Sequence, residues 1–202
     1  AESRGLWRTR DAGETWGKAP LLAGACISVD VDPGNRKVVY AILRGQGLCR
    51  TDNLTTWSAP KHPELDAHEV MCHPHAKGTV LLSSRTTGLW ISTDKGETFA
   101  PLSPGIPEAI PAITHVAAHP TDGTQMMAST DTGWIFVSQD RGASWTRPGN
   151  VGAPVTRLVG SPTSPATWLA AGAGVSLSAD FGTTWQRTLI SADPEDRVVA
   201  LE

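Results

Sequence analysis

The sequence predicts an all-β fold, and three observations support this prediction. Gly (20) and Pro (15) are frequent and only 18% of the 202 residues are charged, which suits many short strands joined by tight turns. No stretch keeps the 3.6-residue apolar period of an amphipathic helix. A segment of eight residues recurs five times, with its aspartates 41, 42, 46 and 40 residues apart. A period near 40 residues corresponds to one blade of a β-propeller, so we expect four-stranded antiparallel blades.

The recurring segment, which we call the box, carries an Asp, then a Gly, a Ser or Thr, and an aromatic residue. Its copies span residues 9–16, 50–57, 92–99, 138–145 and 178–185, with Asp11, Asp52, Asp94, Asp140 and Asp180. The copy at 50–57 is degenerate because it lacks the Gly and the first hydroxyl residue. The Asp can accept hydrogen bonds from its own turn, the Gly can adopt positive φ, and the aromatic ring can pack beneath. The pattern therefore predicts a structural hairpin turn rather than a catalytic site.

The rest of each repeat predicts three further strands. An innermost strand ends in a Pro at 27–33, 69–74, 115–120 and 157–162. A second strand follows at 38–42, 80–83, 126–129 and 167–170, and a Gly opens the third strand before each box. Residues 1–20 and 193–201 carry complementary parts of one more repeat. We therefore expect one domain over 1–202 with five blades, closed by a composite blade, although a fragment of a larger propeller would show the same phase.

Composition excludes several classes of function. With 17 basic and 20 acidic residues, the chain has no strong charge for nucleic acid or an anionic membrane. No apolar run approaches the ~20 residues of a membrane helix, which predicts a soluble domain without membrane insertion. Three cysteines without a CxxC spacing favour buried free thiols over disulfides. His73 and His119 share a repeat position with Asp32 and Ser161, which indicates a polar turn position; no metal or cofactor is expected.

The functional face is expected where the inner strands begin, beside the loops between second and third strands. Equivalent inner-strand positions carry Ser28, Glu69, His115 and Arg157, and the loops add Arg4, Arg44, Arg85 and Asp131. Convergent guanidinium groups recognise carboxylates and phosphates through planar bidentate bonds. The predicted binding set is therefore Arg4, Arg44, Arg85, Arg157, His115 and Glu69.

The five boxes resemble the Asp box of the BNR-repeat families, which include sialidases, xyloglucan-active glycosidases and a photosystem II assembly factor family. This resemblance implies a box between the third and fourth strands, on the side away from the active face. The sialidase resemblance implies a Tyr nucleophile, but the single Tyr40 falls in a second strand and the Arg-Ile-Pro motif is absent. The assembly factor family implies a scaffold that presents an arginine-rich patch to a partner.

Two functions stay open from the sequence. The first is a non-catalytic module whose arginine-bearing face docks an anionic peptide, protein segment or glycan. The alternative is a glycoside hydrolase that uses two carboxylates, with Glu69 and either Asp66 or Asp131 as candidates. A closed ring would be monomeric, and the family resemblance slightly favours an extracytoplasmic location.

Overall fold

A computed structural model describes residues 5–20, 24–102 and 112–190, and these residues form an all-β propeller, as predicted. Their only helical element is one 3₁₀ turn, Pro63–Leu65.

The first blade contains β3 (Cys26–Val31), β4 (Val39–Leu43) and β5 (Gly47–Thr51). The second contains β6 (Ala67–Cys72), β7 (Val80–Ser84), β8 (Gly88–Ser92) and β9 (Ala100–Pro101). The third contains β10 (Ile113–Ala118), β11 (Met126–Thr130), β12 (Trp134–Ser138) and β13 (Thr146–Asn150). The fourth contains β14 (Val155–Ser161), β15 (Ser164–Gly172), β16 (Gly174–Ser178) and β17 (Gln186–Ile190).

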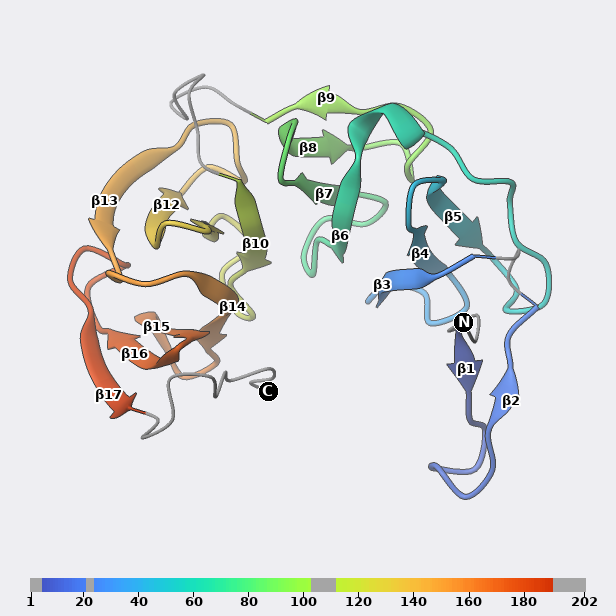
Figure 1. Cartoon of the computed structure of the whole chain (residues 1–202), viewed down its shortest axis with the longest axis horizontal. Coiled ribbons are helices and arrows are strands. Elements are labelled where there is room, and N and C mark those ends of the chain that lie inside the picture. The colour runs from blue at the N-terminus through green and yellow to red at the C-terminus, as the bar shows by residue number, and fades with distance from the viewer. Residues whose placement is uncertain (1–4, 21–23, 103–111, 191–202) are drawn as a thin grey trace.

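The blades stand side by side in an arc, each built from antiparallel strands paired in chain order (Figure 1). The inner strands β3, β6, β10 and β14 face the centre of the arc, while β9, β13 and β17 lie at its outer rim (Figure 1). A separate two-stranded sheet of β1 (Trp7–Arg8) and β2 (Gly17–Lys18) lies beyond the first blade. Within the described residues, no helix is long and apolar enough to cross a membrane.

The hydrophobic core lies between neighbouring blades. Tyr40 and Ile42 of the first blade pack with Val70 and Leu82 of the second. Equivalent clusters join the second to the third blade and the third to the fourth. The second strand of each blade lies between the inner and third strands, and every residue of β4, β7 and β11 is buried. Their sequences do not alternate: β4 is apolar throughout, whereas β7 and β11 each end in two buried hydroxyl residues.

The box turns are held by hydrogen bonds within each turn. After β8, Asp94 Oδ1 accepts from the Thr98 backbone N–H (2.9 Å) and from Ser92 Oγ (2.7 Å), while Oδ2 accepts from Thr98 Oγ1 (2.6 Å). The same arrangement recurs around Asp11, Asp140 and Asp180. In the third blade the Trp145 indole N–H donates to the Gly142 carbonyl (3.0 Å), which fixes the ring beneath the turn.

The turn after β5 departs from the sequence alignment. Asn53, and not Asp52, is its acceptor: Asn53 Oδ1 accepts from the backbone N–H groups of Thr55 and Thr56, both at 2.9 Å. Asp52 forms an ion pair with Arg50 instead. This turn lacks the Gly and is one residue shorter than the others. Asn53 precedes Thr56 by three residues, whereas Asp94 precedes its partner Thr98 by four. The assignment of Asp52 as a box aspartate was therefore wrong by one position.

The first blade also lacks the expected fourth strand. Among the described residues only one bridge, Leu48↔Lys61, pairs with the outer edge of β5, together with a hydrogen bond from the Ser58 N–H to the Arg50 carbonyl (2.8 Å). Pro60 has no N–H to donate to a ladder, so regular pairing cannot continue through it.

The turns that follow the inner strands share one polar position, as predicted. Its side chain accepts a hydrogen bond from the backbone N–H two residues later, at 2.8 to 3.3 Å, in all four blades: Asp32, His73, His119 and Ser161. His73 and His119 are almost fully buried in this role. An Asp, a His and a Ser are interchangeable here because each offers one acceptor atom.

The predicted composite blade is only partly described. The β1–β2 hairpin pairs with no other described strand, and the predicted strands at 193–201 lie outside the described residues. The structure therefore has four blades, and closure by a fifth stays a prediction.

Candidate functional site

A β-bulge near the start of every inner strand positions the candidate site. The register with the second strand shifts between Cys26 and Ser28, and the same shift precedes the equivalent residues Glu69, His115 and Arg157. A bulge adds one unpaired residue and redirects the following side chain. The inner strands begin one residue (β3) or two residues (β6, β10 and β14) earlier than the sequence indicated.

The four inner strands surround a cavity of about 420 Å³ at the centre of the arc. All four residues predicted at the equivalent positions line this cavity: Ser28, Glu69, His115 and Arg157. We call this space the channel. Since the four residues are 41, 46 and 42 positions apart in the chain, only the stacking of blades brings them together.

On the channel wall, Glu69 Oε1 contacts His115 Nδ1. The other carboxylate oxygen, Oε2, accepts from the Val116 backbone N–H and from Ser83 Oγ, both at 3.1 Å. His115 is only 4% exposed. Both oxygens of Glu69 are thus committed to contacts that join the second blade to the third.

Two side chains of β3 join the first blade to the second in a similar way. Ser28 Oγ accepts from the Val70 N–H (3.1 Å), and Asp30 Oδ2 accepts from the Cys72 N–H (2.7 Å). Inner strands of neighbouring blades do not pair as a ladder, so these side chains satisfy inward-facing backbone donors that would otherwise lack partners.

Asp30 belongs to the channel wall, although the sequence interpretation missed it. Burial raises the pKa of its carboxyl, and Glu69 acts in the same direction, whereas Arg157 and two backbone N–H donors oppose the shift. The sequence did contain an indication that Asp30 faces the channel, because Asp30 follows Ser28 by two residues and so shares its side of the strand. The guanidinium of Arg157 makes no ion pair with any described residue and lines the channel.

The predicted loop residues do not line the channel. Arg44 and Arg85 are exposed in the turns after β4 and β7, and Asp131 is exposed after β11. Arg4 lies outside the described residues. Asp66 is exposed and accepts a hydrogen bond from Thr86 Oγ1 (3.0 Å), outside the channel wall. The structure therefore brings together the inner-strand positions, whereas Arg44, Arg85 and Asp131 lie in exposed turns that do not line the channel.

Tyr40 is buried in the core, and its hydroxyl donates to the Lys95 carbonyl (3.3 Å). Burial raises its pKa to about 12. The position of Tyr40 agrees with the sequence argument that it cannot act as a nucleophile at the channel.

The fold is similar to that of several solved propellers. No family model and no curated protein matches the chain. An ancestral GH74 enzyme matches with TM-score 0.70 and 22% identity, over 91% of this chain and 25% of that chain. YCF48 from Cyanidioschyzon merolae matches with TM-score 0.65 and 14% identity, over 88% and 60%. A structure of YCF48 bound to D1 peptide matches with TM-score 0.58 and 16% identity, over 92% and 75%.

The chain therefore spans about a quarter of the GH74 enzyme and over half of the YCF48 proteins. At these identities the likeness concerns the fold. The chain has the β-propeller architecture found in both a group of glycoside hydrolases and a peptide-binding protein.

Proposed function

We propose that this protein is a non-catalytic binding module that docks an acidic peptide segment at the channel mouth. The observation that carries this proposal is Arg157, a cation in the channel wall without an ion-pair partner among the described residues. Arg44 and Arg85 add exposed positive charge in the turns after β4 and β7. Because β4 and β7 run antiparallel to β3 and β6, these turns lie at the end of the sheet where the inner strands begin. Guanidinium groups around a concave site favour carboxylate ligands.

The state of Glu69 supports binding over hydrolysis. A glycosidase carboxylate must reach the sugar or a water molecule, but both oxygens of Glu69 are occupied by His115, Val116 and Ser83. A YCF48 structure was solved with a bound peptide, which supports a peptide as the ligand class of the channel. We further propose that the recurring turns are Asp boxes of the BNR type, as their sequence and hydrogen bonds suggest.

The experiment is fluorescence anisotropy with labelled peptides of graded acidity. Arg157→Ala is expected to weaken binding of the acidic peptides about tenfold, the lower range for losing a charge-assisted pair. Arg36→Ala is the matched control, because Arg36 is exposed in the turn between β3 and β4, away from the channel mouth. Equal affinities for the two variants, or no preference for acidic peptides over neutral ones, would refute the proposal. Binding of acidic glycans alone would change the ligand class from peptide to sugar.

One observation favours a second candidate, glycoside hydrolysis. Asp30 lines a cavity and has a raised pKa, and a carboxyl with a raised pKa is suited to a general acid. Its two oxygens accept backbone N–H groups, from Val31 (2.8 Å) and Cys72 (2.7 Å), so this role requires one of these bonds to open. The fold likeness to GH74 enzymes makes glycosides the substrates to test. Turnover of fluorogenic glycosides or xyloglucan that disappears in Asp30→Asn would support this candidate; absent turnover by the folded wild-type protein would eliminate it.

A further inference from the structure

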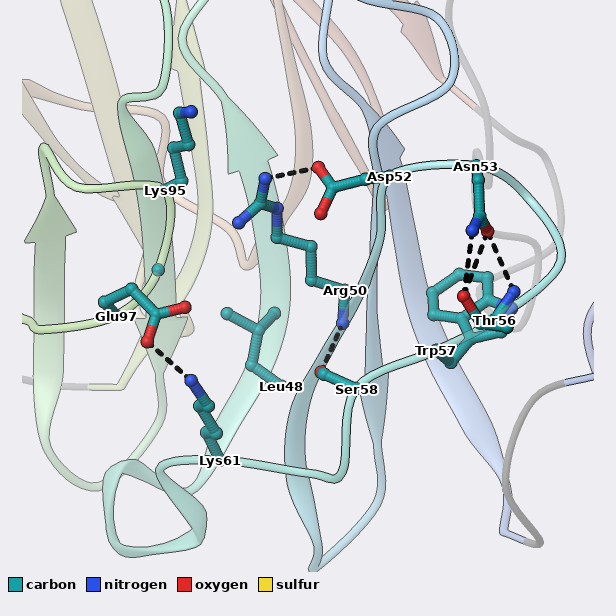
Figure 2. Close-up of a pocket in the computed structure, with 11 residues that line it drawn as sticks. Leu48, Arg50, Asp52, Asn53, Thr56, Trp57, Ser58, Lys61, Lys95 and Glu97 are labelled. Carbon is teal, nitrogen blue, oxygen red and sulfur yellow. Dashed lines mark hydrogen bonds and ion pairs between the residues drawn. The ribbon is translucent and has the colours of Figure 1, made fainter.

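A second cavity of about 320 Å³ lies along the outer edge of β5, separate from the channel (Figure 2). It exists because the first blade lacks a regular fourth strand and its box turn is one residue short. One wall comes from the first blade, with Arg50 and Trp57, and the other from the box turn of the second blade, with Lys95 and Glu97. We call this space the rim pocket.

Two residues that line the rim pocket each carry an N–H donor without an acceptor. Arg50 Nε and Trp57 Nε1 are buried and have no hydrogen-bond partner among the described residues. The rest of the Arg50 guanidinium is held in place, since Nη2 is paired with Asp52 and its central carbon lies 5.9 Å from the centre of the Tyr40 ring. A buried donor without an acceptor is destabilising, so these two groups favour a ligand that accepts hydrogen bonds.

The charges of the rim pocket leave one cation in excess. Three cationic side chains, Arg50, Lys61 and Lys95, face two carboxylates. Lys61 pairs with Glu97 (2.5 Å) and lowers the pKa of that carboxyl, and Arg50 pairs with Asp52. Lys95 has no ion-pair partner among the described residues, and it lines the same pocket as the Arg50–Asp52 pair (Figure 2).

We propose that the rim pocket binds a small oxyanion, a carboxylate or a phosphate. The anion accepts hydrogen bonds from Arg50 Nε and Trp57 Nε1 and neutralises Lys95. A cavity of this volume admits a single anionic group or the acidic end of a longer molecule. This site is independent of the channel, because the two cavities share no residue.

The test is a titration followed by ¹H–¹⁵N NMR, with sodium phosphate and sodium acetate as probes and sodium chloride at matched ionic strength as reference. The resonances of the Trp57 indole N–H and the Arg50 Nε–H are expected to shift and saturate with phosphate or acetate but not with chloride. Trp57→Phe assigns the indole signal. Saturation with only one probe identifies which oxyanion the pocket takes.

Lys95→Gln is expected to weaken the apparent Kd about two- to fivefold, the range for one partly exposed ion pair. Lys77→Gln is the matched control, because Lys77 is exposed and does not line the rim pocket. Non-saturating shifts, shifts of the same size with chloride, or equal affinities for Lys95→Gln and Lys77→Gln would overturn the proposal. An unchanged spectrum outside the pocket verifies that each variant is folded.

Discussion

At the scale of residues, the channel wall is built from side chains that take the place of backbone pairing between blades. Ser28 and Asp30 bind N–H groups of β6, and Glu69 binds one of β10. Two residues of the predicted binding set, Glu69 and His115, thus also join neighbouring blades. Arg157 differs from them, since it lines the channel without an ion-pair partner among the described residues.

This double role predicts the effect of mutating Glu69. Glu69→Ala removes the acceptor of the buried Val116 N–H and the partner of His115, so the free energy of unfolding should fall by about 1–3 kcal/mol. Glu69→Gln retains an acceptor oxygen and should cost less. Urea denaturation measures both variants, with the exposed Glu14→Gln as control, expected within about 0.5 kcal/mol of wild type. A loss no larger than that of the control would show that Glu69 does not join the blades.

At the scale of elements, hydrogen bonds within the box turns stabilise the ionised form of their aspartates. The pKa of Asp11 is lowered to about 2, chiefly by the hydrogen bond from the Thr15 hydroxyl. The pKa values of the other three lie below the ordinary value of 3.8 for the same reason: Asp94, Asp140 and Asp180. A carboxyl whose pKa is lowered on folding stabilises the fold above its unfolded pKa, and this stabilisation is lost as pH falls through the folded pKa.

The melting temperature should therefore decrease as pH falls from about 4 to about 2. Asp94→Asn should make this decrease shallower, because it removes one of the titrating groups. Thr98→Val should do the same, since the Thr98 hydroxyl is the largest cause of the lowered pKa. The double variant should add little beyond either single change. Thermal melts across this pH range measure all four proteins, and parallel curves would contradict the prediction.

The box glycines provide a matched test of packing against backbone strain. Gly13 and Gly142 both have positive φ, +98° and +87°. A Cβ on Gly13 would meet no atom within 4 Å, whereas on Gly142 it would lie 2.8 Å from Leu102 Cδ2. Gly142→Ala should therefore lower the free energy of unfolding by about 1–3 kcal/mol more than Gly13→Ala, as overpacking does. Urea denaturation of both variants measures this difference; equal losses would leave backbone strain as the sole cause.

At the scale of the whole molecule, the first-blade end of the arc carries apolar positions without the cover that the other blades receive. Val29 is 46% exposed, whereas the equivalent residues Val70, Val116 and Leu158 are at most 4% exposed. On the β1–β2 hairpin, Trp7 and Trp16 are also more than half exposed. An apolar face of this kind normally packs against another blade.

We predict that residues 193–201 and the β1–β2 hairpin form that blade and cover Val29. Val29→Asp would then place a charge in a blade interface and lower the melting temperature by roughly 4 °C or more, taking 2 kcal/mol as a lower bound for burying it. Thermal unfolding of the full chain measures this effect, and Lys37→Asp, in the exposed turn after β3, is the control. A melting temperature equal to that of the control would show that Val29 is uncovered in this chain.

The sequence by itself determined the all-β architecture, the inner-strand positions of the channel and the shared turn position of Asp32, His73, His119 and Ser161. These features repeat because each depends on hydrogen bonds and strand alternation within a few residues. The tertiary structure alone decided that Asn53 replaces Asp52, that both oxygens of Glu69 are occupied, and that a rim pocket opens beside β5. The occupied oxygens of Glu69 and the rim pocket depend on a neighbouring blade about 40 residues away, and the local pattern of residues does not encode such contacts. The change to Asn53 depends on a turn that is one residue shorter, which the alignment of the repeats did not reveal.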